Sequence, residues 1–357
     1  MHVVFSAECN HLFDWHSVAL FHSFARVQQH GNVTRLLACA PHELAKYPKT
    51  ALEMGPTFVH RNMRDDPLVD EKGYPSYNKP YSVMVWLAAN SISEDYILMM
   101  DADMIMRNTI DPVSLGAARG RVVSAEYTYL VGTESGFAER FIAKSLIPRL
   151  AQVGGFHIFH REDLRKIAPL WLEYTKRVRA FAHQDLETFF HESMHIPADT
   201  PKETVAVRKK QSMWHSEMYG YVFAAAEVGV THRVRRDVML YPGYEPFMGR
   251  GPAILHYGSD YTVETHFYFN KMMHTELRLE TCPKFLFGAP ETVDWSALRK
   301  RDALCIEHLN TMNSAFCGFY RRIGCSQIPA KCSDEGLARM TDMISRSREV
   351  MERHALH

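Results

Sequence analysis

The chain has 357 residues, of which 46% are hydrophobic and 23% are charged, a composition typical of a globular protein. Its 41 basic and 41 acidic side chains balance, so no general positive field for nucleic acid is expected. No apolar run approaches the roughly 20 residues that a membrane-spanning helix needs. The first residues, MHVVFSAECN, lack the charged and apolar regions of a signal peptide, so we expect a soluble chain, either cytosolic or a lumenal domain separated from its signal or anchor.

Predicted strands and helices alternate from the start of the chain. Three early segments are β-branched or aromatic and predict buried strands: residues 2–8, 33–40 and 56–60. A helix is predicted from residue 11 up to Gly31, a residue type that often follows a helix end. A second helix over residues 78–91 has Pro80 near its first turn, where the missing N–H does no harm.

The same alternation continues to residue 230. Strands are predicted over residues 95–100 and 120–130, and a strand leads into a helix over residues 154–178. A further helix begins at residue 216 and is ended by Gly229. This order of elements implies a largely parallel, doubly wound sheet. Ligands bind such sheets outside the carboxyl ends of the strands.

From about residue 276 the pattern changes to cysteines, a helical stretch near 295–313 and an amphipathic helix near 336–352. Five of the seven cysteines lie in this last part: Cys282, Cys305, Cys317, Cys325 and Cys332. They are either scattered free thiols or a disulfide-stapled segment from an oxidising compartment. Cys9 and Cys39 follow the first two predicted strands and could pair if those strands are neighbours. Asn32 begins the triplet NVT, a possible glycosylation site.

Two carboxylates, Asp101 and Asp103, directly follow the predicted strand YILMM. The simplest interpretation is a polar turn at the end of a buried strand. The alternative is a metal site, because carboxylates two positions apart in a turn can face one ion. Mg²⁺ and Mn²⁺ prefer such oxygen ligands and keep positions open for substrate phosphates.

A second short apolar strand offers a third ligand. In AILHYGSDY, His256 lies at the strand end and is followed by a turn at Gly258. Lys79 lies at a helix start, where amide N–H groups favour anions, and Lys271 follows His256 by a short distance. The two lysines are either solvated surface residues or, with a metal, groups that neutralise a diphosphate leaving group.

Glu217 begins an otherwise apolar and aromatic helix in the segment MWHSEMYGY. It could be a desolvated reactive carboxylate, a group that binds sugar hydroxyls, or a first-turn Glu that favours the helix dipole. The pair Gly154–Gly155 would let the backbone pass close to a ligand. The sequence has no G-x-G-x-x-G after a strand, no Walker motif and no G-x-S-x-G elbow, which weakens dehydrogenase, kinase and serine-hydrolase interpretations. A parallel nucleotide-binding sheet with a D-x-D metal turn is the combination found in a nucleotide-sugar glycosyltransferase.

Several segments over residues 2–275 together resemble the plant and green-algal peptidyl-serine α-galactosyltransferases, with a more distant likeness to hydroxyproline O-arabinosyltransferases, which share EMYGY. These segments are FSAECNHLFDWHSVALFHSF, TRLLAC, YNKPYSVMVWL, DADMI, LGAARGR, IAPLWL, SEMYGYVFAAAEVG, YPGYEP and LHYG. The resemblance implies an α/β fold of the GT-A type, Rossmann-like, with a mostly parallel sheet and flanking helices. It also implies a retaining, metal-dependent transfer of galactose from UDP-galactose to serine hydroxyls of hydroxyproline-rich, extensin-like glycoproteins.

The resemblance assigns roles to residues of this chain. It implies that Mn²⁺, or another divalent cation, is held by Asp101, Asp103 and His256. Lys79 and Lys271 would contact the donor phosphates, with Gly258 beside them. Lys79 and Glu217 are the candidate catalytic residues, and the role of Glu217 stays open among contacting galactose, orienting the acceptor and stabilising developing positive charge.

The change of pattern near residue 276 divides the chain into two parts, and the resemblance further implies a location. Residues 1–275 would form the catalytic domain, and residues 276–357 a cysteine-containing helical extension. The full-length protein would be membrane-anchored and face the lumen of the endoplasmic reticulum or Golgi, which favours disulfides. Two alternatives remain: a hydroxyproline O-arabinosyltransferase that uses a UDP-arabinose donor, and a catalytically inactive glycan- or peptide-binding relative.

Overall fold

The computed structural model describes residues 1–197, 199–246, 251–263 and 267–353. Its centre is a seven-stranded sheet with the order β3-β2-β1-β4-β7-β6-β8. Neighbouring strands run parallel except at β7, which is antiparallel to both β4 and β6. The strands are β1 (His2–Glu8), β2 (Val33–Cys39), β3 (Thr57–Arg61), β4 (Tyr96–Asp101), β6 (Arg121–Glu126), β7 (Val153–His160) and β8 (Thr231–Arg235). This is the α/β fold with a mostly parallel sheet and flanking helices that the sequence predicts.

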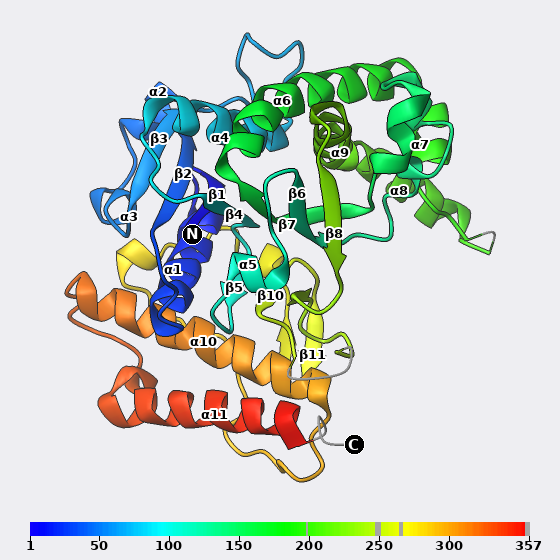
Figure 1. Ribbon diagram of the computed structural model, residues 1–357. Helices are drawn as coiled ribbons and strands as arrows, with labels where there is room; N and C mark the ends of the chain where they lie inside the picture. The colour runs from blue at the N-terminus through cyan, green and yellow to red at the C-terminus, as the bar shows by residue number, and fades with distance from the viewer. Residues whose placement is uncertain (198, 247–250, 264–266, 354–357) are drawn as a thin grey trace.

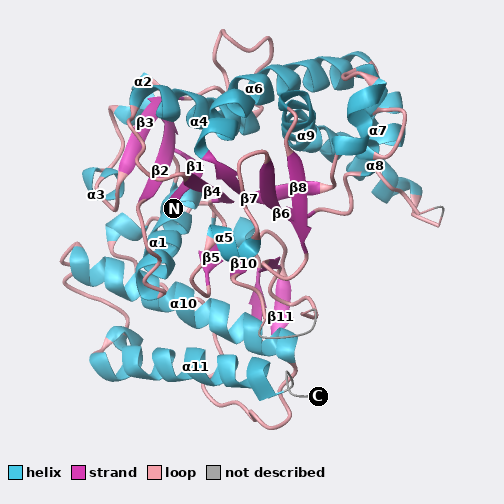
Figure 2. Ribbon diagram, viewed as in Figure 1, coloured by secondary structure: helices cyan, strands magenta, loops and turns pink. Residues whose placement is uncertain are grey.

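Helices cover both faces of the sheet (Figures 1 and 2). On one face lie α4 (Asn78–Ala89), α6 (Arg161–Gln184) and α9 (Ser216–Val228), and on the other lies α1 (His11–Arg26). Shorter helices lie at the periphery: α2 (Pro41–Leu44), α3 (Lys49–Leu52), α5 (Pro112–Leu115), α7 (Leu186–Ser193) and α8 (Lys202–Ser212).

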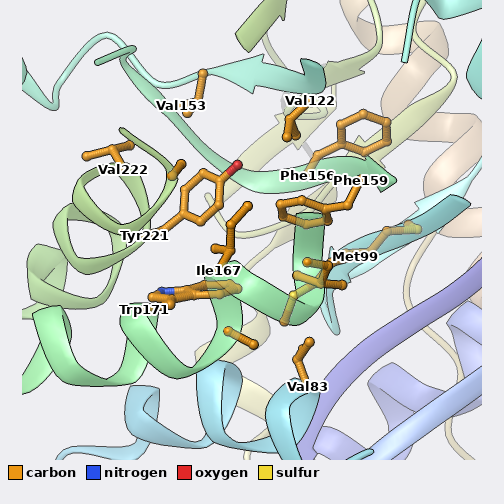
Figure 3. Close-up of a cluster of buried hydrophobic side chains, with 14 of the residues drawn as sticks. Val83, Met99, Val122, Val153, Phe156, Phe159, Ile167, Trp171, Tyr221 and Val222 are labelled. Atoms are coloured by element: carbon orange, nitrogen blue, oxygen red, sulfur yellow. The ribbon is translucent and has the colours of Figure 1, made fainter. Parts of the chain in front are cut away.

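The main core lies between the sheet and the helices α4, α6 and α9 (Figure 3). Strands buried on both faces are largely apolar, and β7 is buried from Val153 to Phe159 with His157 as the polar exception. Trp171 of α6 and Tyr221 of α9 pack against each other with ring centroids 5.1 Å apart. This core fixes the strand ends that carry the candidate site residues.

A second apolar cluster joins the C-terminal helices to the other side of the sheet. It combines α1, a small sheet and the helices α10 (Lys300–Arg322) and α11 (Asp334–Arg353). The small sheet consists of β5 (Met104–Met106), β9 (Met239–Leu240) and β10 (Ile254–His256), and a separate hairpin follows with β11 (Tyr261–Val263) and β12 (Phe267–Phe269). The division into domains at residue 275 stays a prediction.

Several predicted element ends differ from the structure. The first helix ends at Arg26 rather than at Gly31, because Gln28 already has a left-handed φ of 53° and breaks the helical path. Gly229 does end α9, with a φ of 87°. The helical stretch expected near residues 295–313 begins at Lys300 and continues to Arg322. Within the described ranges, no helix is both long and apolar enough to cross a bilayer.

Three disulfides link cysteines that the sequence left unassigned. Two lie in the C-terminal segment, Cys282–Cys325 and Cys317–Cys332, and the third, Cys9–Cys39, joins the ends of neighbouring strands β1 and β2. The expected disulfide among the C-terminal cysteines and the conditional pairing of Cys9 with Cys39 are therefore confirmed. Cys305 is a buried free thiol.

Alkylation of the unfolded, non-reduced protein should modify one cysteine, Cys305, because the other six are bonded. Reduction before alkylation should give seven modified cysteines, and intact mass distinguishes the two states. Reduction should also destabilise the fold, by about 2–4 kcal/mol for each disulfide lost. Seven modified thiols without reductant would contradict these pairings.

Candidate active site

One pocket of about 530 Å³ opens where strand β1 and strand β4 end. Ser6, Ala7 and Glu8 of β1 and the turn after β4 form part of its lining. The pocket thus lies at the carboxyl ends of these strands, where α/β folds bind their ligands. The pocket brings together every site residue that the sequence predicts: Lys79, Asp101, Asp103, Glu217, His256, Gly258 and Lys271.

Three of these residues form a group that can hold a metal ion. Asp101 ends β4 and Asp103 follows in the turn to β5. Strand β10 runs antiparallel to β5 with His256 opposite Met104, which brings the imidazole beside the turn. One ligand atom from each of Asp101, Asp103 and His256 lies within 4.8 Å of the others. Two carboxylates and an imidazole suit Mn²⁺ or a similar divalent cation.

The His256 ring is oriented by its neighbours. Its Nε2 faces Asp103 Oδ1 at 3.2 Å, and its Nδ1 lies 3.3 Å from the Tyr127 hydroxyl. Tyr241 packs on the ring with centroids 4.6 Å apart. A histidine whose second nitrogen is fixed in this way presents the other nitrogen to an ion in a defined direction.

Both predicted lysines contact the carboxylates of the pocket. Lys79 Nζ lies 2.7 Å from Asp101 Oδ1 and 3.2 Å from Glu217 Oε2, and Lys271 Nζ contacts the Asp103 carboxylate. Neither lysine is therefore a freely solvated surface residue. With all three carboxylates ionised, the two lysines leave one negative charge uncompensated, which favours a bound cation.

Burial and charge shift the protonation of these groups. Burial disfavours the charged form of Asp103, but Lys271 and His256 outweigh it and hold the pKa of that carboxyl well below its usual value. Burial also opposes the charge of Lys79, yet Asp101 and Glu217 raise its pKa. Burial raises the pKa of Glu217, and Lys79 only partly offsets this. Lys79 is therefore a fixed positive charge in the pocket.

Glu217 is held in the first turn of α9 by backbone contacts. Its N–H donates to the Tyr74 hydroxyl at 3.0 Å, and its carbonyl accepts from Trp171 Nε1 at 3.0 Å. The side chain is only 3% exposed and points to Lys79. A surface first-turn Glu would not be so enclosed, which leaves a role inside the pocket.

Two glycines keep the space around the metal-ligating side chains free of further side chains. Gly155 has a φ of +64°, and a Cβ there would lie 2.9 Å from Asp101 Oδ2 and closer still to the Tyr127 hydroxyl. The expected close approach at Gly154–Gly155 thus exists, but protein side chains occupy the space. A Cβ at Gly258 would lie 2.9 Å from His256 Nε2 and 3.4 Å from Asp103 Oδ2. A side chain at either position would crowd the ligand group.

A second polar cluster in the pocket was not predicted from the sequence. Glu8, at the end of β1, contacts the Arg64 guanidinium and accepts a hydrogen bond from Asn78 Nδ2 at 2.8 Å. Asn78 Oδ1 in turn accepts from the Met63 N–H at 2.7 Å. The signal that could have found Glu8 is the one used for Asp101: a carboxylate at the carboxyl end of a buried strand.

Comparison with known proteins identifies the family. A family model described as the hydroxyproline O-arabinosyltransferase family N-terminal domain matches residues 1–188. The peptidyl serine α-galactosyltransferase of Arabidopsis thaliana is 36% identical over 98% of this chain and 40% of its own length. The Chlamydomonas reinhardtii protein of that name is 31% identical over 90% of this chain and 46% of its own length. The chain thus spans less than half the length of these two relatives.

More distant likenesses exist. Hydroxyproline O-arabinosyltransferase 3 of Arabidopsis thaliana is 28% identical over 61% of this chain and 54% of its own length. A solved structure of the galactosyltransferase LgtC with donor and acceptor sugar analogues is 13% identical and has a TM-score of 0.39 over 72% of this chain and 87% of that one. The family model, which covers more than half of the 357 residues, is the decisive match. The chain belongs to the hydroxyproline O-arabinosyltransferase family.

Proposed function

We propose that the chain is a metal-dependent, retaining glycosyltransferase that transfers galactose from UDP-galactose to serine hydroxyls of hydroxyproline-rich, extensin-like glycoproteins. The observation that carries the proposal is the pocket in which Asp101, Asp103 and His256 lie together with Lys79 and Lys271. The donor and acceptor follow the two relatives that share 36% and 31% identity and are named as peptidyl serine α-galactosyltransferases.

The charges of the pocket suit departure of a nucleoside diphosphate. A divalent cation at Asp101, Asp103 and His256, Mn²⁺ in our proposal, would neutralise charge on the diphosphate. Lys271, beside Asp103, would contact a diphosphate oxygen and add a second positive charge on that side. Lys79 keeps its proton and would stabilise the leaving group from the Asp101 side.

Retention of configuration requires attack from the face that the leaving group vacates. The serine oxygen forms its bond to the anomeric carbon while the bond from that carbon to the phosphate oxygen breaks. The departing phosphate oxygen takes the hydroxyl proton. Glu217 lies against Lys79 at 3.2 Å, and its carboxylate would stabilise positive charge that develops on the sugar.

Exposed apolar side chains at the pocket suit a peptide acceptor. Trp214 and Met272 line the pocket and are 52% and 60% exposed. Tyr244, 53% exposed, packs on Tyr241 of the lining with centroids 5.4 Å apart. Exposed aromatic and thioether groups around a polar pocket are typical of contact surfaces, and proline-rich chains dock on such aromatic surfaces. We place the acceptor peptide across Trp214, Tyr244 and Met272.

Replacing Trp214 by Ala should raise the KM for an acceptor peptide about tenfold, because an aromatic anchor of the contact surface is lost. The KM for UDP-galactose should stay unchanged. Initial rates over a range of peptide and donor concentrations measure both. The matched control is Val207→Ala, which removes an equally exposed apolar side chain of α8. An unchanged peptide KM in the Trp214 variant would remove this residue from the acceptor surface.

A donor-by-acceptor panel tests the proposed function. UDP-galactose and UDP-arabinose are each combined with serine-containing and hydroxyproline-containing peptides, with and without Mn²⁺, and the anomer of the product is assigned. Transfer of α-linked galactose to serine, dependent on Mn²⁺, is expected. Transfer of arabinose to hydroxyproline would instead favour the activity for which the hydroxyproline O-arabinosyltransferases, relatives of lower identity, are named. Binding without release of UDP would favour an inactive relative.

We also propose that the protein works in the lumen of the secretory pathway and that the full-length form is membrane-anchored. Three disulfides support this location, because disulfides persist in oxidising compartments. Asn32 of the NVT triplet is exposed, as a glycosylated asparagine must be. Localisation of a tagged full-length protein by microscopy, with a glycosidase shift for Asn32, tests both statements.

A further inference from the structure

His16 of α1 is a buried polar side chain that no protein group satisfies. The residue is 2% exposed, and neither ring nitrogen has a hydrogen-bond partner in the described part of the chain. Aromatic rings enclose it: Trp15 lies 4.1 Å away between centroids and Tyr257 lies 5.4 Å away. Buried polar groups in folded proteins nearly always have a partner, so an unpartnered imidazole needs an explanation.

The ring lines the candidate active site, at the end where Asp103 lies. His16 contributes to the pocket lining together with Asp103 and Lys271. These two residues exert the strongest electrostatic effects on its ring. His16 is not part of the group of ligand atoms within 4.8 Å of one another, so it does not complete the metal site. It therefore lines the pocket without belonging to the ion-ligand group.

The chemistry of the ring fits a neutral hydrogen-bond donor. Burial lowers the pKa of the His16 imidazole to about 3, so the ring carries one N–H and no charge at neutral pH. Lys79 and Lys271 already contact carboxylates, whereas the His16 N–H has no acceptor among the described residues. A ligand oxygen that enters the pocket would supply the missing acceptor.

We propose that the ring N–H of His16 donates a hydrogen bond to a diphosphate oxygen of the nucleotide-sugar donor. This inference rests on the proposed function. It adds a donor-binding residue on α1, a helix that carries neither Lys79 of α4 nor Glu217 of α9. The contact is to the substrate itself, so its loss should weaken nucleotide binding without changing the affinity for the metal alone.

Binding of UDP to the His16→Leu and His16→Gln variants, measured by calorimetry with Mn²⁺ present, tests the proposal. Leu removes the donor, and Gln keeps an N–H donor. A hydrogen bond to a charged oxygen is worth enough that the Kd for UDP should rise about tenfold or more in His16→Leu. It should stay within about threefold of wild type in His16→Gln. The affinity for Mn²⁺ alone should not change in either variant.

Uridine serves as the probe without phosphate, and its affinity should be the same in all three proteins. A wild-type chain that does not bind UDP would overturn the proposed function. If the wild type binds UDP and His16→Leu binds it equally well, only the present inference fails, and a buried water would then satisfy the ring. The inference would also be overturned if His16→Leu lost affinity for uridine and for UDP to the same degree. The same holds if His16→Leu and His16→Gln lost affinity for UDP equally.

A measurement on the wild-type protein covers the case in which His16→Leu does not fold. Protein labelled with ¹⁵N-histidine is titrated with UDP in Mg²⁺, and the His16 ring signal is assigned by its absence from His16→Gln. A ring N–H that becomes protected from solvent exchange when UDP binds supports the hydrogen bond. A ring signal that UDP does not shift or protect would overturn it.

Discussion

Replacing Asp103 by Asn should lower kcat/KM for transfer by about three powers of ten or more. The carboxylate is 8% exposed, lies 3.2 Å from His256 Nε2 and contacts Lys271, so it is the centre of the proposed ion site. An amide keeps the shape but removes the negative charge that holds a cation. Metal-based charge stabilisation is worth several kcal/mol, and each 1.36 kcal/mol is a factor of ten in rate.

Two further measurements separate loss of the ion from loss of the fold. The affinity for Mn²⁺, measured by calorimetry, should fall in Asp103→Asn, while the melting temperature should stay close to that of the wild type. The matched control is Asp342→Asn, the same chemical change on the exposed face of α11, which should change neither property. Near-normal, Mn²⁺-dependent turnover in Asp103→Asn would refute the assignment of Asp103 as a ligand.

The ligand turn could be predicted from the sequence, because its signal is local. Asp101 and Asp103 follow a run of apolar residues typical of a buried strand, and the carboxyl ends of such strands are where α/β sheets bind ligands. Their partners come from far along the chain. Lys271 contacts Asp103 across 168 positions, and Lys79 contacts Glu217 across 138. Spacing alone gives no reason for these contacts, and neither was predicted from the sequence.

Other features of the structure had no local signal. The alternation of strands and helices predicts a mostly parallel sheet, but it does not predict that β7 runs antiparallel between β4 and β6. An apolar strand has the same pattern in either direction. His16 has no signal beyond its place in a predicted helix, because periodicity shows that a face is buried but not that a pocket opens there. The pairing of β10 with β5 depends on tertiary packing in the same way.

The C-terminal helices are connected to the ligand turn by a buried ion network. Glu307 of α10 is fully buried and accepts from Arg107 Nε at 2.6 Å and from Arg348 Nε of α11 at 2.8 Å. Arg107 directly follows β5, and its carbonyl accepts from Arg348 Nη2 at 2.6 Å. One carboxylate thus holds two guanidinium groups from different parts of the chain. The strand after Asp103 is thereby fixed to both helices.

Replacing Glu307 by Gln should destabilise the fold by about 3 kcal/mol, because it leaves the buried Arg107 guanidinium and the partly exposed Arg348 guanidinium without their carboxylate. Denaturant unfolding followed by circular dichroism measures the loss. The matched control is Glu291→Gln, which breaks an exposed pair with Lys331 at 2.6 Å and should leave the midpoint unchanged. A Glu307→Gln midpoint equal to that of the wild type would show that the network adds no net stability.

The same variant also tests whether the C-terminal helices matter for the site itself. Below the unfolding transition, the folded Glu307→Gln protein should bind Mn²⁺ more weakly than the wild type, because β5 positions Asp103 on one side and pairs with His256 on the other. If Glu307→Gln is less stable but binds Mn²⁺ with unchanged affinity, stabilising the fold and positioning the ion ligands are separate roles. The helices would then stabilise the domain without positioning the ion ligands.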